Sequence, residues 1–166
     1  ITAFASNAGE NGRMRFIAGT NEGMNIDSSG RVLKPDQPGF MIGLSGGHVT
    51  STGVVPFNNA YFNTGGHFNT STGVFTAPVT GVYQFNALML LQVNLAAGYY
   101  YWSYTYNGSA LTYCYEYMPT ANFHRQYQLS ICYKMSANDT MSVYNHTGHW
   151  YGTATQHSQF SGYLLG

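Results

Sequence analysis

Formal charge is the property this sequence has least of. Only 7% of its 166 residues are Asp, Glu, Lys or Arg, against about 25% in a typical soluble protein. Basic and acidic residues number six each, so the formal net charge is zero. Proteins that bind nucleic acid gain much of their affinity from basic side chains that neutralise phosphates. We therefore expect no nucleic-acid partner.

Long apolar runs and cysteines are also scarce. The longest apolar run lies near residues 87–91, far short of the roughly 18 residues that a membrane-spanning helix needs, so we expect no membrane insertion. Cys114 and Cys132 are the two cysteines, which excludes a disulfide scaffold. Both lie in predicted strands, so a single bridge and two buried free thiols both stay open. Neither has a cysteine at the close spacing of a structural zinc site.

Helical periodicity is missing as well, whereas alternation of apolar and polar residues runs along most of the chain, which predicts an all-β protein. Short strands separated by turn residues favour a sandwich or a barrel. The predicted strands span residues 40–45, 55–62, 66–69, 74–79, 82–92, 99–106, 109–117, 124–135, 140–145 and 159–165.

The turn at Asn107–Gly108 is typical of a two-residue hairpin. Uninterrupted pairing from Tyr106 opposite Ser109 then places an aromatic stripe on one face of the hairpin. This stripe is predicted to consist of Tyr100, Trp102, Tyr104, Tyr113 and Tyr115. Aromatic stripes occur in cores, in subunit interfaces and in ligand platforms, of which core or interface is the commoner use.

Tyrosine takes the place of charge in this chain, with 15 Tyr in all. A protein with so little charge lacks electrostatic solubility if it stays monomeric. The tyrosines are therefore expected either to be buried between subunits or to face a polyhydroxylated ligand, and a tyrosine-rich subunit interface is the simpler interpretation.

Three segments follow from the pattern: a β-rich stem at 1–33, a Pro-punctuated linker at 34–38 and a head at 39–166. The stem alternates at Met14 and Phe16 but has too few apolar residues for a core. We expect it to trimerise or to dock on a neighbour. The chain starts at Ile1 and lacks a signal-peptide pattern, so we expect a piece of a longer protein.

Three motifs in the head carry a family resemblance. They are "VPFNNAYFNTGGHFNTSTGVFTAPVTGVYQF", "YNGSAL" and "FSGYLLG". In this order they resemble the globular head of complement C1q, in the tumour-necrosis-factor-like superfamily. The resemblance implies a ten-stranded jelly-roll sandwich that assembles as a homotrimer. The signature positions are Gly73, Phe75, Pro78, Gly81, Tyr83, Phe85, Phe160 and Gly162.

The chain differs from the typical members of this family in two respects, and each limits what the resemblance implies. The head has only Glu116 and Asp139 as acids, so the calcium site of many family members is not carried over. No collagen-like repeat is visible, and "GMNIDSSGRVLKPDQPGF" resembles bacteriophage tail-fibre and virion-fibre segments. We therefore expect a non-enzymatic virion protein that contacts other virion proteins through its stem and a host-surface glycan or protein through its head. The alternatives are a purely structural capsid decoration or fibre protein and a secreted C1q-like recognition protein.

Catalytic and metal chemistry find little support in the residues. With only two acids in the head, a catalytic histidine has no clear carboxylate partner, and there is little choice for the pair of carboxylates that a glycosidase needs. We therefore assign no catalytic residue and no cofactor. His67 lies in the family signature and is interpreted as structural. His146 and His149 could converge on a metal near a threefold axis, but surface imidazoles are the simpler interpretation, and no metal is assigned.

The candidate binding site comes from the alternation of strand direction. Counted back from the last strand, loops 93–98, 118–123 and 146–158 lie at one end, the apex, and the turns at 107–108 and 137–138 lie at the base. Loops on a rigid β scaffold commonly carry binding, and aromatic rings beside amides suit sugars. The predicted apex residues are Asn94, Asn122, His146, His149, Trp150 and Tyr151. The alternative is that Trp150 plugs the axial end of the trimer core.

Overall fold

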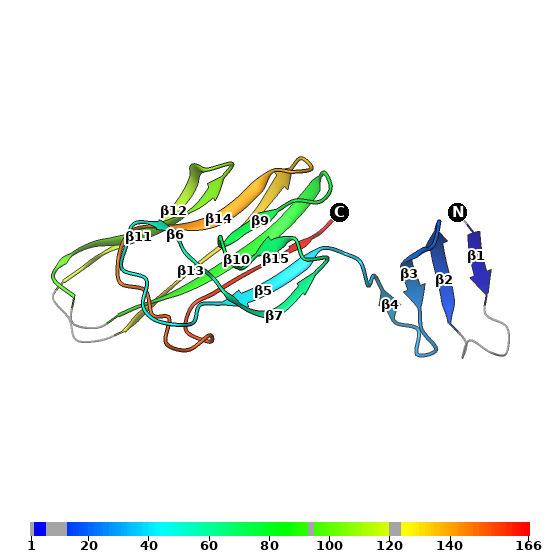
Figure 1. Ribbon diagram of the computed structural model, residues 1–166, viewed down its shortest axis with the longest axis horizontal. Coiled ribbons are helices and arrows are strands. Elements are labelled where there is room, and N and C mark those ends of the chain that lie inside the picture. Colours follow the sequence, from blue (N-terminus) through cyan, green and yellow to red (C-terminus); the bar gives the residue numbers. More distant parts are fainter. Residues whose placement is uncertain (1, 6–12, 93–94, 120–123) are drawn as a thin grey trace. The chain divides into compact units, whose positions relative to one another are not determined.

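A computed structural model describes residues 2–5, 13–92, 95–119 and 124–166 of the chain (Figure 1). The chain divides into two compact units, Ile1–Gln37 and Pro38–Gly166, and the division falls inside the predicted linker. The described residues form strands and turns and no α-helix. They accordingly contain no helix long and apolar enough to cross a membrane.

The N-terminal unit is a single antiparallel sheet in the order β1-β2-β3-β4. Its strands are β1 (Thr2–Ala5), β2 (Met14–Ala18), β3 (Asn21–Ile26) and β4 (Val32–Leu33). Among the side chains described in this unit, only that of Asn25 is fully buried. The described residues of the unit therefore form a sheet but no hydrophobic core of their own.

The second unit, the head, is the predicted all-β sandwich, with two antiparallel sheets packed face to face. One sheet has the order β13-β10-β15-β5-β7, with β13 (Arg125–Met135), β10 (Gly81–Leu91), β15 (Gln159–Leu164), β5 (Gly39–Gly43) and β7 (Asn59–Thr64). The other has the order β12-β11-β14-β9-β8, with β12 (Ser109–Met118), β11 (Gly98–Tyr106), β14 (Thr140–Thr147), β9 (Val74–Thr76) and β8 (Phe68–Asn69).

One predicted strand, at 55–62, is wrong. The short β6 (Gly53–Val54) pairs with β14 in one sheet, and β7 pairs with β5 in the other. The chain crosses between the two sheets at Pro56, which has no N–H to offer a strand ladder. Val55 and Phe57, on either side of the proline, are both completely buried in the core.

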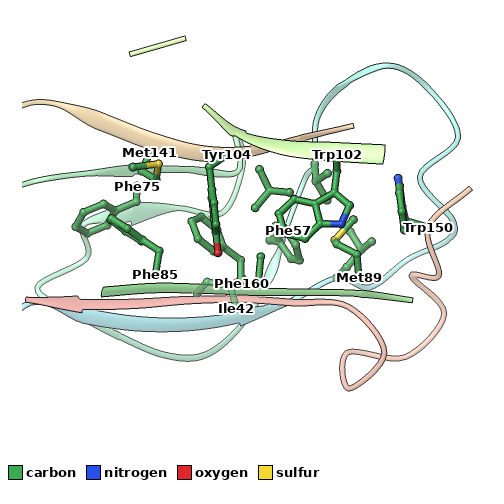
Figure 2. Close-up of a cluster of buried hydrophobic side chains, with 14 of the residues drawn as sticks. Ile42, Phe57, Phe75, Phe85, Met89, Trp102, Tyr104, Met141, Trp150 and Phe160 are labelled. Carbon is green, nitrogen blue, oxygen red and sulfur yellow. The ribbon is translucent and has the colours of Figure 1, made fainter. Parts of the chain in front are cut away.

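Aromatic rings fill the space between the two sheets (Figure 2). The Phe40 ring contacts those of Phe75 and Phe160, with centroids 5.0 Å away in each case. The four aromatic signature residues Phe75, Tyr83, Phe85 and Phe160 are all at most 1% exposed. These positions therefore form the frame of the sandwich.

Glycine is required at two signature positions. A Cβ on Gly162 would lie 2.6 Å from the Phe85 ring and 2.8 Å from the Phe40 ring. Gly73 has a φ of +73°, and its Cβ would lie 2.3 Å from the carbonyl oxygen of Val55. Both glycines thus permit close approaches that any larger residue would prevent.

The two ends of the sandwich are arranged as the alternation of strands predicts. At the base, Asp139 accepts hydrogen bonds from the Tyr106 hydroxyl and from Nδ2 of Asn107, at 2.6 and 2.9 Å. At the same end, the carbonyl oxygen of the C-terminal Gly166 accepts a hydrogen bond from the N–H of Val82, which lies at the start of β10. At the apex, the amide of Gln92 donates to the carbonyl of His149.

Candidate functional site

The four described residues of the predicted apex site, which are His146, His149, Trp150 and Tyr151, do not form one cluster. Asn94 and Asn122 lie outside the described residues. His149 is exposed, and its carbonyl is used by the Gln92 amide. Tyr151 is half-buried, and its ring contacts those of His48, His124 and His157 at centroid distances of 4.5, 5.1 and 4.9 Å. Tyr151 is therefore partly covered by the rings of three histidines.

Trp150 is completely buried, so its prediction as a ligand contact is wrong. Residue 150 forms β-bridges to both Val49 and Leu91, and its ring lies at one end of the core cluster (Figure 2). Its indole N–H donates to Oδ1 of Asn145 at 2.7 Å. Trp150 thus plugs one end of the core of a single chain. The alternative interpretation, a plug at the axial end of a trimer core, stays a prediction.

The predicted aromatic stripe is also wrong, because the register of the β11–β12 hairpin changes at a bulge. Pairing begins as predicted at Tyr106↔Ser109, but beyond Thr105 it shifts by one residue, so that Tyr104 lies opposite Thr112. Leu111 is therefore the extra residue of a β-bulge. A shift by one residue exchanges the two faces of a strand. Trp102 and Tyr104 consequently point into the core, whereas Tyr113 and Tyr115 point outward.

The bulge collects tyrosines on the outer face of the hairpin. Tyr101 lies directly opposite Tyr115, and Tyr99 lies opposite Tyr117. Tyr99, Tyr101, Tyr113 and Tyr115 line a hollow of about 440 Å³. Three of these side chains are largely exposed, at 61% for Tyr99, 49% for Tyr113 and 65% for Tyr115.

A second bulge brings His146 to the same face. Against β11, the partner of Tyr101 is Thr147 and the partner of Trp102 is Asn145, which leaves His146 as the extra residue. Its ring stacks on that of Tyr101, with centroids 5.0 Å apart and planes 10° apart. It also contacts the ring of Tyr113 at 5.3 Å. We call Tyr99, Tyr101, Tyr113, Tyr115 and His146 the tyrosine face.

The tyrosine face is uncharged near neutral pH. Burial lowers the pKa of His146 below its ordinary value of 6.5, because a charged imidazolium loses hydration when it is covered. Its Nε2 atom lies 2.9 Å from the hydroxyl oxygen of the buried Ser103. The face therefore offers aromatic surfaces, tyrosine hydroxyls and a neutral imidazole to a ligand.

In the described part of the chain, the side chains form no arrangement that is typical of a catalytic or a metal site. No histidine there hydrogen-bonds a carboxylate, and no group of three or more His, Cys, Asp or Glu side chains is placed to hold a metal ion. Cys114 and Cys132 are both free, and Cys132 is exposed rather than buried. His67 accepts the Thr76 amide through its main-chain carbonyl.

Residues 39–165 match the C1q domain. The chain belongs to the C1q domain family. Domains of this family are generally non-enzymatic and trimeric. The match does not include the stem, so the resemblance of that segment to phage fibres stays a prediction. No curated protein sequence matches the chain significantly.

Solved structures with the same fold have very different sequences. The globular domain of zebrafish complement 1qA has a TM-score of 0.64 and 16% identity, over 78% of this chain and 98% of the other. Murine APRIL at pH 5.0 has a TM-score of 0.63 and 11% identity, over 78% and 99%. Eiger TNF from S. frugiperda has a TM-score of 0.62 and 14% identity, over 79% and 94%. At such identities the likeness establishes the C1q/TNF jelly-roll fold alone.

Proposed function

We propose that this chain is a non-enzymatic, homotrimeric recognition head of a virion fibre, and that its tyrosine face binds a neutral glycan on a host surface. Membership of the C1q domain family supports the trimer and the lack of catalysis. The low charge of the chain supports recognition by stacking and hydrogen bonding rather than by ion pairing.

The tyrosine face is the observation that carries the proposal. Large aromatic side chains are normally buried, yet three of the four tyrosines that line the hollow are about half exposed or more. Ligand sites combine aromatic walls with a few polar groups that fix orientation. Tyrosine rings stack on the C–H faces of sugars, and their hydroxyls, with the imidazole of His146, hydrogen-bond to sugar hydroxyls.

The outward face of β10 and β13 in the other sheet suits the subunit contacts of a trimer. There, Gln84 Nε2 donates to the Ser130 hydroxyl at 2.7 Å, and this hydroxyl in turn donates to Oδ1 of Asn86 at 2.7 Å. Leu88 and Leu90 on the same face are half-buried in a single chain. Lys134, which is paired with Val82, is the one charged residue that β10 and β13 place on this face. The neutral, ordered side chains on the rest of the face lose less hydration energy when they are covered than charged ones would.

The virion location rests on the N-terminal β-unit, which resembles a fibre stem, and on the lack of a collagen-like repeat in this chain. Mass spectrometry of purified particles of a virus that carries this gene should detect the protein. Its absence from the particles would contradict this part of the proposal. A particle-bound protein without ligand binding would instead favour the capsid-decoration alternative.

Ligand binding is tested with the full chain on an array of neutral and acidic oligosaccharides. We expect binding to neutral glycans. In the double variant Tyr99→Ala/Tyr115→Ala, affinity should fall at least 10-fold, since stacking surfaces contribute about 1 kcal/mol or more each. Tyr61→Ala is the matched control, because Tyr61 is 51% exposed but lies on β7 in the opposite sheet.

The outcomes separate the parts of the proposal. Equal loss in the control variant would show that the effect is not specific to the tyrosine face. No binding to any oligosaccharide by a folded trimer would overturn the ligand class. Light scattering of the same samples checks the trimer independently, because a monomeric mass contradicts the homotrimer whatever the array shows.

A further inference from the structure

The sheet formed by β1, β2, β3 and β4, here the stem sheet, has one apolar face. Met14 pairs with Ile26, Phe16 pairs with Met24, and Ile26 pairs in turn with Val32. Directly paired residues of antiparallel strands point to the same side of a sheet. The apolar face therefore consists of Met14, Phe16, Met24, Ile26 and Val32.

The opposite face of the stem sheet carries Ile17 opposite Glu22 but is otherwise more polar, and its charged groups already have partners. The guanidinium of Arg15 pairs with the carboxylate of Glu22, which also accepts a hydrogen bond from Nδ2 of Asn25. Asn25 is 1% exposed. Leu33, paired with Asn25, lies at the margin of this face. Polar contacts within one chain thus satisfy much of this side of the sheet.

No described residue of the N-terminal unit covers the apolar face. The four strands form one layer (Figure 1), and no apolar side chain described in the unit is fully buried. A hollow of about 260 Å³ is lined by Phe16 and Met24 of this face, together with Ile17, Ala18 and Gly23. The hollow is wide enough to receive a large apolar side chain.

A bare face of this kind is unstable in water. A sheet with one apolar side must bury that side against another layer, and units of about 40 residues or fewer seldom fold without help from oligomerisation, metals or disulfides. The unit has no cysteine, and no metal cluster is present among its described residues. Association with another protein surface is the remaining means of stabilising it.

We propose that the apolar face of the stem sheet packs against the same face of other copies of this chain, so that three stem sheets enclose one shared core. A trimeric head would hold three identical faces near one another at high effective concentration. The face carries no charged residue, so no like charges oppose its self-association. The inference rests on the homotrimer but not on the ligand of the head.

Thiol reactivity in the full-length protein tests whether the face is covered. In a Cys114→Ser/Cys132→Ser background, Met14→Cys places a thiol on the apolar face and Leu33→Cys places one on the polar face. The two positions are matched, because Met14 is 40% and Leu33 42% exposed in the single chain. We expect the thiol at position 14 to react with Ellman's reagent at least 10-fold more slowly than the thiol at 33.

Cross-linking identifies what covers the face. A short bismaleimide should join Met14→Cys chains into dimers on a denaturing gel, and mixing tagged with untagged chains should give tagged–untagged products. Equal reaction rates at positions 14 and 33 in a protein of trimeric mass would overturn the inference. Slow reaction without inter-chain products would overturn it too, in favour of docking on the chain's own head. A monomeric mass would instead contradict the homotrimer itself.

Discussion

The indole nitrogen of Trp150 donates a hydrogen bond to Oδ1 of Asn145 at 2.7 Å, and both side chains are completely buried. The amide of Asn145 also donates to the carbonyl of Ser51 at 2.9 Å. One asparagine thus ties the end of β14 to two loops. The segment that looked from its residues like a ligand loop instead closes the end of the sandwich.

Replacement of Asn145 by Ala should lower the free energy of unfolding by about 2–3 kcal/mol, because it leaves a buried indole N–H and a carbonyl without their partner. Urea unfolding followed by fluorescence measures the loss. In a Trp150→Phe background the same replacement should cost less, since one of the two orphaned groups is then absent. Equal costs in the two backgrounds would show that the Asn145–Trp150 bond contributes nothing to stability.

Gly148 should tolerate a side chain poorly. Its φ is +143°, and a Cβ there would lie 2.8 Å from the indole ring of Trp150. Gly47 is a matched control with a φ of +135° and nothing within 4 Å of its Cβ position. We expect Gly47→Ala to cost about 1–2 kcal/mol from backbone strain. Gly148→Ala should cost at least about 1 kcal/mol more, from the added clash. Thermal unfolding of both variants checks the difference, and equal costs would contradict it.

The strands could be predicted from the sequence because their signals are local and repeated, whereas the jelly-roll arrangement was implied by the family resemblance. Strict alternation predicts β13, where Tyr127 and Met135 are buried and Gln126 and Gln128 are exposed. The Asn107–Gly108 turn occurs where predicted, with Asn107 at a φ of +47°. Such signals need only neighbouring residues, so they survive without knowledge of the tertiary structure.

The candidate site could not be predicted, because two bulges decide it. Leu111 and His146 each enter a strand as an extra residue, and nothing in their own residue types requires a bulge. The bulge at Leu111 exchanges the faces of one half of the hairpin, which separates Tyr115 from Trp102. Tyr99 and Tyr101 do alternate in the sequence, as do Tyr113 and Tyr115, but alternation alone does not say which tyrosines share a face.

The corrected register has a direct energetic consequence. Trp102 is completely buried and Tyr115 is 65% exposed, although uninterrupted pairing would place them on one face. Trp102→Ala should therefore cost about 3–5 kcal/mol, as large-to-small replacements in cores do. Tyr115→Ala should change stability by no more than about 0.5 kcal/mol. Chemical unfolding of the two variants measures both losses of stability. Comparable losses would contradict the bulge and support the uninterrupted register instead.

Lowering the pH should reduce the stability of the folded protein through protonation of His146 in the tyrosine face. Its pKa is lowered by burial in the folded protein, so the unfolded chain binds a proton more readily as the pH falls below about 6.5. The stabilisation that the neutral ring provides is thus fully present above that pH and is lost as the pH falls through the folded pKa. The groups packed around this ring are Tyr101, Tyr113, Tyr144 and Ser103.

A His146→Gln variant should therefore lose less stability between pH 7 and pH 5 than the natural protein, and glycan binding by the natural protein should weaken over the same interval. His67→Gln serves as the control, because His67 lies near β8 rather than on the tyrosine face. Nuclear magnetic resonance titration of the His146 ring gives its pKa directly. A value at or above 6.5 would contradict the expected direction, because it would mean that packing against Tyr101 favours the charged ring over the neutral one.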